Sequence, residues 1–217
     1  MDFKTARRRM VESQVRTNDV TDLRLQTALE ETPREAFLPP ALRNQAYVER
    51  EIAYAPGRVL LTARDFAKLL AAAEPQPGDL ALIVAAGAGY SAAVLARLVE
   101  MAVAVESDAA LAAQAQETLN TLDVGNAAVL HAAAAAGAPK QGPYDLIVID
   151  GGIEKRPDAL LAQLKEGGRL AAIQRIGGVF RGVVYRRSGD AFACAEKFDA
   201  TTRTVLPGFA AEKAFVF

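Results

Sequence analysis

Short apolar runs alternate with helix-like stretches from about residue 78 onward. The apolar runs lie at 80–84, 102–105, 127–130, 144–150 and 169–173. The helix-like stretches lie between them, at 91–100, 108–122 and 157–164. Strands that alternate with helices form a parallel sheet that is covered on both faces, and such strands are apolar throughout. The pattern therefore predicts an α/β domain of the Rossmann type over residues 78–217.

The two ends of the chain depart from this pattern. Residues 1–77 have helical periodicity, with Phe3, Ala6 and Met10 on one stripe, which predicts an N-terminal helical region packed on the core. Near the C-terminus, runs at 179–187 and 192–198 flank a polar turn and predict an antiparallel hairpin. Residues 214–217 have the pattern of a last strand. We expect a mostly parallel seven-stranded sheet with a C-terminal antiparallel hairpin.

Composition and charge exclude several classes of protein. The chain has 217 residues, with 25 Lys and Arg against 26 Asp and Glu, so a protein that coats nucleic acid is not expected. Its single cysteine excludes an internal disulfide and a cysteine-based zinc cluster, and no metal site is expected. The N-terminal residues lead into no apolar segment. We expect a soluble, cytoplasmic protein without a membrane partner.

A glycine turn followed by an acid has the layout of a nucleotide site. Gly87 and Gly89 lie between a predicted strand and a helix, and Glu106 ends the next strand. Glycines let a ligand approach the backbone, the helix start offers free N–H groups, and an acid placed there can bind ribose hydroxyls. A dinucleotide, S-adenosylmethionine and a turn without any ligand all remain open. The C-terminal hairpin and the lack of a second substrate domain favour S-adenosylmethionine.

Several blocks resemble the protein-L-isoaspartate O-methyltransferase family in order and spacing. They lie at 10–16, 33–39, 46–49, 87–92, 105–106, 142–145 and 163–170. The resemblance implies the class I methyltransferase fold and S-adenosylmethionine as methyl donor. It also implies that the acceptor is the carboxylate of a damaged Asp or Asn residue in a protein or peptide. Methyl transfer would be a direct displacement, which needs orientation and no strong base.

The sequence departs from the family pattern where polar groups usually face the cofactor or the acceptor. Ile83 replaces an acid, Ala85 replaces the first glycine, and Ala133 replaces the Asp that faces adenine. The family's Ser-Gln pair falls at about Leu61-Thr62, and that serine is usually given a direct role in transfer. Lost hydrogen bonds lower the affinity for the cofactor. The alternative is therefore a catalytically degenerate member that acts as a binding or scaffold protein.

These considerations give a short set of candidate residues. The cofactor-binding candidates are Gly87, Gly89 and Glu106, and the catalytic candidates are Thr62, as a substitute hydroxyl, and Asp150, at the end of the fourth strand. Glu106 could instead be an exposed strand-end acid, and Asp150 could serve in a cap or turn. The enzymatic interpretation requires an open crevice beside the glycine turn. The sequence does not give the oligomeric state.

Overall fold

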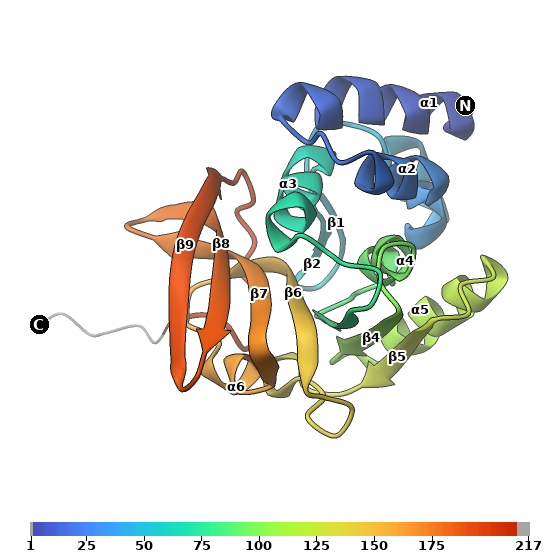
Figure 1. Ribbon diagram of the computed structural model, residues 1–217. Helices are drawn as coiled ribbons and strands as arrows, with labels where there is room; N and C mark the ends of the chain where they lie inside the picture. Colours follow the sequence, from blue (N-terminus) through green and yellow to red (C-terminus); the bar gives the residue numbers. More distant parts are fainter. Residues whose placement is uncertain (1, 212–217) are drawn as a thin grey trace, which may run out of the picture.

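A seven-stranded sheet forms the centre of the molecule in the computed structural model, which describes residues 2–211 (Figure 1). The strand order is β5-β4-β3-β6-β7-β8-β9. The strands are β3 (Leu80–Val84), β4 (Met101–Glu106), β5 (Ala127–His131), β6 (Tyr144–Ile153), β7 (Leu164–Ile176), β8 (Val179–Ser188) and β9 (Ala191–Asp199). Pairs from β5 to β7 are parallel, and β8 and β9 are antiparallel. The predicted α/β fold is confirmed.

Both faces of the sheet are covered, which explains why its central strands are apolar throughout. On one face Ala81 and Ile83 pack with the helices α3 (Ala63–Ala73), α4 (Tyr90–Ala96) and α5 (Ala109–Thr121). On the other face Leu82 and Val84 pack with α6 (Asp158–Leu161), a 3-10 turn at Ala134–Ala136, and residues near Leu206. Successive side chains of a strand point to opposite faces, so β3 joins both cores.

The N-terminal region lies over the face of the sheet that α3 and α4 cover (Figure 1). Its helices are α1 (Phe3–Met10), which continues as a π-helix at Val11–Val15 and a 3-10 turn at Arg16–Asn18, and α2 (Leu23–Glu31). Two further 3-10 turns follow at Arg34–Phe37 and Pro40–Gln45. Asp2 and Asp22 accept backbone N–H groups at the starts of α1 and α2, as capping residues do.

Four expectations from the sequence need correction or stay open. The helical prediction for residues 1–77 is wrong at β1 (Ile52–Ala55) and β2 (Arg58–Leu60), which form a hairpin around Gly57 at a φ of 64°. The helix predicted at 157–164 is shorter, because β7 begins at Leu164. The strand predicted at 214–217 lies outside the described residues. The boundary at residue 77 stays a prediction, since one cluster of buried residues includes side chains from both parts.

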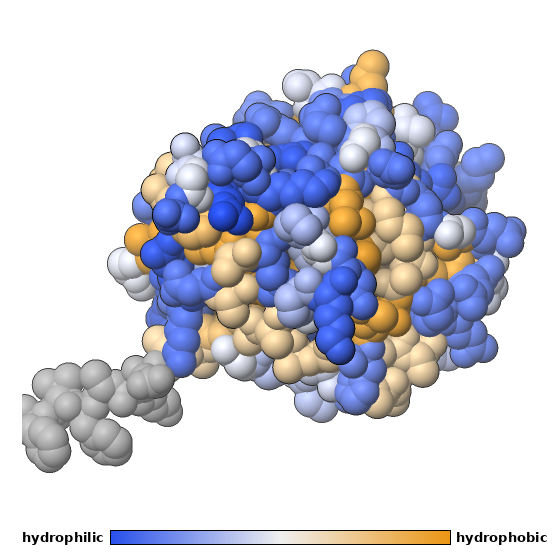
Figure 2. All heavy atoms as spheres, turned by 60° about the horizontal axis from the view of Figure 1, so that its bottom comes forward, coloured by the Kyte–Doolittle hydropathy of each residue, from blue (hydrophilic) through white to orange (hydrophobic). Residues whose placement is uncertain are grey.

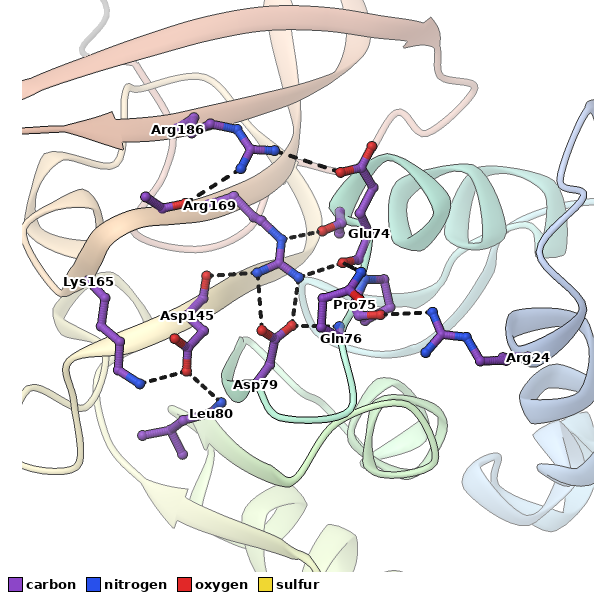
Figure 3. Close-up of polar contacts among 12 residues, drawn as sticks. Arg24, Glu74, Pro75, Gln76, Asp79, Leu80, Asp145, Lys165, Arg169 and Arg186 are labelled. Carbon is purple, nitrogen blue, oxygen red and sulfur yellow. Dashed lines mark hydrogen bonds and ion pairs between the residues drawn. The ribbon is translucent and has the colours of Figure 1, made fainter.

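Arg169 joins the two parts at the amino edge of the sheet (Figure 3). Its guanidinium donates to the carbonyl oxygens of Ala73 and Glu74 at 2.7 and 2.5 Å and forms an ion pair with Asp79 at 2.6 Å. It also donates to the carbonyl of Asp145 at 3.1 Å. Arg169 and Asp79 are buried. A single side chain therefore holds the end of α3, the start of β3 and strand β6 together.

The surface is mainly hydrophilic, with apolar side chains in separate patches on the side that Figure 2 shows. The large exposed apolar side chains among residues 2–211 are Leu23, Val48 and Val179, which lie on different segments. In this part of the chain, no helix combines the length and the apolar character that a membrane span needs.

Candidate functional site

The glycine turn follows β3 at the carboxyl edge of the sheet, as the sequence predicts. Ala85, Gly87 and Gly89 have φ values of 60°, 54° and 98°, and Gly89 is the residue before α4. The positive φ at Ala85 shows that the first-glycine position keeps the glycine conformation although the residue has a Cβ. An L-residue in this region costs roughly 1–2 kcal/mol. The turn therefore keeps its shape under strain.

Glu106 lies beside this turn, and both of its carboxylate oxygens are already bound. Arg58 donates to them from Nε and Nη2 at 2.9 and 2.6 Å. The backbone N–H groups of Gly87 and Asp108 donate to the same carboxylate at 2.8 and 2.9 Å. The side chain of Glu106 has an exposed fraction of 0% and that of Arg58 has 5%. The alternative that Glu106 is an exposed strand-end acid is wrong.

The charge of this pair is fixed by its neighbours. Burial alone would raise the pKa of Glu106, but the Arg58 guanidinium and the N–H groups of Asp108 and Gly87 hold it below its ordinary value. Glu106 is therefore ionised at neutral pH. Because two N–H donors of Arg58 match the two oxygens, the pair is a charge-assisted bidentate contact, which is stronger than a contact with neutral donors.

Tyr54 covers the glycine turn from the same hairpin. Its hydroxyl accepts a hydrogen bond from the backbone N–H of Ala88 at 3.2 Å. A Cβ added to Gly87 would lie 1.8 Å from this hydroxyl, so Tyr54 fills the room that the glycine leaves. Burial raises the pKa of Tyr54, with the nearby Asp150 adding to the effect, so the phenol stays protonated.

The polar groups beside the glycine turn suit an adenosyl ligand, but the side chains around them leave it no room. The turn, the α4 start and the Glu106 carboxylate are the groups that such a ligand requires. In the described conformation, however, Arg58 binds the carboxylate that would receive the ribose hydroxyls, and Tyr54 lies on the turn. The crevice that the sequence interpretation required is therefore occupied by the chain itself. The assignment of Gly87, Gly89 and Glu106 to a cofactor stays a prediction.

Asp150 lies next to this pair on β6, but the strand does not end there. It runs on to Ile153, and its pairing with β7 is irregular between Val148 and Gly152. The suggested cap or turn is therefore not what the structure shows. Burial raises the pKa of Asp150 to about 6, although the Ser91 hydroxyl and the charges of Arg34 and Arg58 act in the opposite direction. A carboxyl group with a raised pKa at the carboxyl edge is typical of a functional site.

Arg34 lies near Asp150 and Tyr90, and this position was not predicted from the sequence. It is buried and donates to the carbonyls of Ala46 and Leu61 at 2.9 and 2.8 Å, with its guanidinium 4.9 Å from the centre of the Tyr90 ring. The buried hydroxyls of Tyr90 and Ser91 face Arg34 and Asp150 at this place.

Thr62 lies at the start of α3. Its hydroxyl accepts the N–H of Asp65 at 3.0 Å, so it serves as a helix cap. Thr62 also lines a cavity of about 350 Å³ together with Glu49, Arg50, Glu51, Arg64, Thr201 and Arg203. Its catalytic role stays a prediction. Two further departures from the family pattern replace a polar residue with an apolar one. Ile83 is part of the buried core, and Ala133 lies directly before the 3-10 turn at Ala134–Ala136.

Arg58 and Tyr54 are the residues that sequence reasoning missed. The signal was present in Pro56-Gly57, a turn sequence between two short apolar runs, which is typical of a hairpin. The hairpin was not predicted because the residues on both sides of it have helical periodicity.

The chain matches the family model for protein-L-isoaspartate(D-aspartate) O-methyltransferase over residues 5–195. Among its relatives, protein-L-isoaspartate O-methyltransferase 1 of Syntrophobacter fumaroxidans is 35% identical over 78% of this chain and 79% of its own length. The protein-L-isoaspartate O-methyltransferase of Roseiflexus castenholzii is 31% identical over 97% of this chain and 96% of its own.

Solved structures agree on the fold. A protein-L-isoaspartate O-methyltransferase superposes with a TM-score of 0.80 at 22% identity, over 93% of this chain and 66% of that one. A putative protein-L-isoaspartate O-methyltransferase from Plasmodium falciparum, in complex with S-adenosyl-L-homocysteine, gives 0.75 at 16% identity, over 92% and 97%. Of the two ligand classes left open by the glycine turn, the family match favours the methyl donor.

Proposed function

Because the chain belongs to the protein-L-isoaspartate O-methyltransferase family, we propose that it is an S-adenosylmethionine-dependent protein carboxyl O-methyltransferase of the isoaspartyl repair type. One observation carries the proposal for this chain. The glycine turn and Glu106 are joined by the Gly87 N–H at 2.8 Å, at the edge where folds of this class bind nucleotides. Its net charge of −1 gives no positive excess to attract nucleic acid or an anionic membrane surface, and its single cysteine fits a cytoplasmic location.

The residues proposed for the cofactor are Gly87, Gly89 and Glu106. The acceptor needs less from the protein, because an isoaspartyl carboxylate is already anionic and gives up no proton in the transfer. The use of the Thr62 hydroxyl as a helix cap is therefore compatible with activity. What the chain must provide is orientation of the acceptor and exclusion of water.

We place the acceptor in the cavity that Thr62 lines, because arginines suit an anionic group. Three arginines, Arg50, Arg64 and Arg203, line this cavity from three segments, against two acids, Glu49 and Glu51. Guanidinium groups bind carboxylates through paired hydrogen bonds. Arg203→Gln should raise the KM for an isoaspartyl peptide by about tenfold at nearly unchanged kcat. A matched Arg97→Gln variant, at an exposed pair with Glu31, should leave KM unchanged. An unchanged KM in Arg203→Gln would place the acceptor elsewhere.

The decisive test of the function combines binding and turnover. Isothermal titration with S-adenosylhomocysteine should give a saturable signal, and an isoaspartyl peptide should be methylated. Glu106→Gln, which keeps the shape of the side chain and removes its charge, should lose about tenfold or more in affinity for the ligand. Absence of heat at millimolar ligand, together with absence of turnover, would overturn the proposal and leave the family relationship alone.

A further inference from the structure

The β1–β2 hairpin carries two side chains onto the groups assigned to the cofactor. Arg58 follows directly after the turn at Gly57 and forms the bidentate contact with Glu106. Its Nη2 also donates to the Ser107 hydroxyl at 2.9 Å. Tyr54, on the other strand, receives the N–H of Ala88 in the glycine turn. Both contacts use polar groups that an adenosyl ligand would need.

Glu106 does not depend on Arg58 to remain hydrogen-bonded. Without the guanidinium, its carboxylate still accepts the N–H groups of Gly87 and Asp108, and the Ser107 hydroxyl lies at 3.3 Å. Two ribose hydroxyls could replace the two N–H donors of Arg58 on the same oxygens. The carboxylate is thus a site at which one pair of donors can be exchanged for another.

The hairpin is short, and its base is buried. Its strands have four and three residues and pair only with each other, with an irregular register between Ala53 and Ala55. Such a hairpin is marginally stable alone. Ile52 and Leu60 are buried at its base. Pro207 lies against Gly57 on one side of the tip, which restricts the direction in which the tip can turn.

We propose that this hairpin is an internal competitor for the cofactor. Arg58 holds Glu106, Tyr54 covers the glycine turn, and an adenosyl ligand binds only after both side chains have turned away. The inference rests on the proposed function, because it assumes that Glu106 receives a ribose. It identifies Arg58 as a residue that sets the affinity for the cofactor without taking part in the methyl transfer.

The fractions of molecules with an open and with a closed hairpin set the size of the effect on cofactor affinity. A ligand that binds only the open form has its apparent affinity lowered by the fraction of molecules that are open. Opening breaks the bidentate, charge-assisted contact between Arg58 and Glu106, so the closed form is favoured in the free protein. Removing the Arg58 guanidinium should therefore raise the affinity for S-adenosylhomocysteine by about tenfold or more.

The first experiment is titration of S-adenosylhomocysteine into the full chain and the variants Arg58→Gln and Arg58→Ala. Both variants should bind more tightly than the unchanged chain, whereas Arg97→Gln, at an exposed ion pair, should bind equally. Folded Arg58 variants that bind with equal or lower affinity would overturn the inference while the proposed function stands. If no protein binds at millimolar ligand, the proposed function fails together with the inference.

A second measurement does not depend on the folding of the Arg58 variants. The chain contains no Trp, and Ala53 is exposed on β1, so Ala53→Trp places a single reporter on the hairpin. S-adenosylhomocysteine should shift its emission, and amide exchange over residues 52–60 should become faster in the complex. Binding seen by titration without any change in the reporter or in exchange would show that the hairpin stays in place, which contradicts the inference.

Discussion

Two buried arginine–carboxylate pairs lie at opposite edges of the sheet, and their surroundings differ. At the amino edge, Arg169 and Asp79 approach to 2.6 Å, and the guanidinium also donates to main-chain carbonyls (Figure 3). At the carboxyl edge, Arg58 and Glu106 also approach to 2.6 Å. There, the buried hydroxyls of Tyr90 and Ser91 face Arg34 and Asp150.

The difference indicates which pair serves stability and which serves function. The contacts of Arg169 connect the end of α3, the start of β3 and strand β6. Separation of Arg169 from Asp79 would therefore also weaken the packing of these segments. The carboxyl edge instead holds Asp150, a half-buried acid with a raised pKa, which is typical of a functional site. Backbone strain does not distinguish the two edges, because Ala85 at the carboxyl edge and Glu74 at the amino edge both have positive φ.

The largest expected effect is at the amino edge. Arg169→Ala removes the donors to Ala73 and Glu74 and leaves Asp79 buried without its partner. Breaking a buried pair in this way costs about 3–5 kcal/mol of unfolding free energy. Urea denaturation would measure the loss, with Arg97→Ala as an exposed control that should lose less than about 1 kcal/mol. A loss below about 1 kcal/mol for Arg169→Ala would remove the contrast between the two edges.

An intermediate effect, of opposite sign, is expected for Asp150→Asn. The pKa of this carboxyl is raised from 3.8 to about 6 by burial, so the native state holds a proton that the unfolded chain releases. Between these values the native state binds more protons, and stability falls as pH rises. Asparagine cannot ionise. The variant should therefore gain roughly 3 kcal/mol over the unchanged chain at pH 8 and almost nothing at pH 4.

Thermal unfolding at the two pH values would test this prediction. An equal difference between variant and unchanged chain at both pH values would show that the ionisation of Asp150 is not coupled to folding. The functional edge would then lack one of the features that distinguish it from the amino edge.

The smallest effect is expected at Ala85. Glycine adopts its φ of 60° without strain, and this gain is partly offset by the greater freedom of glycine in the unfolded chain. Ala85→Gly should raise the unfolding free energy by about 0.5 kcal/mol. Ala86→Gly is a matched control, because Ala86 is equally buried and has no positive φ, and it should be destabilising. Equal losses in both variants would show that the turn is not strained.

The sequence was sufficient for the sheet and for the place of the glycine turn. Continuous apolar runs such as 144–150 indicate buried parallel strands, and Glu106 was correctly placed beside Gly87 because strand ends of a parallel sheet meet at one edge. These features depend on local patterns, which a single sequence contains.

The partners of the site residues could not be predicted in the same way. Arg58 reaches Glu106 across 48 residues, and Arg34 reaches the Leu61 carbonyl across 27. Contacts of this kind depend on how separate elements pack, and nothing in the residues near Arg58 distinguishes a buried guanidinium from an exposed one. The short hairpin was also masked by helical periodicity on both sides.

The place of Arg169 bears on recombination between relatives. A chimera joined near residue 77 would take the carbonyls of Ala73 and Glu74 from one parent and the guanidinium of residue 169 from the other. Such a hybrid would fold well only where the second parent supplies both an arginine at position 169 and an acid at position 79. Exchange of the N-terminal part thus requires that its main chain bring two carbonyls to the guanidinium of the second parent.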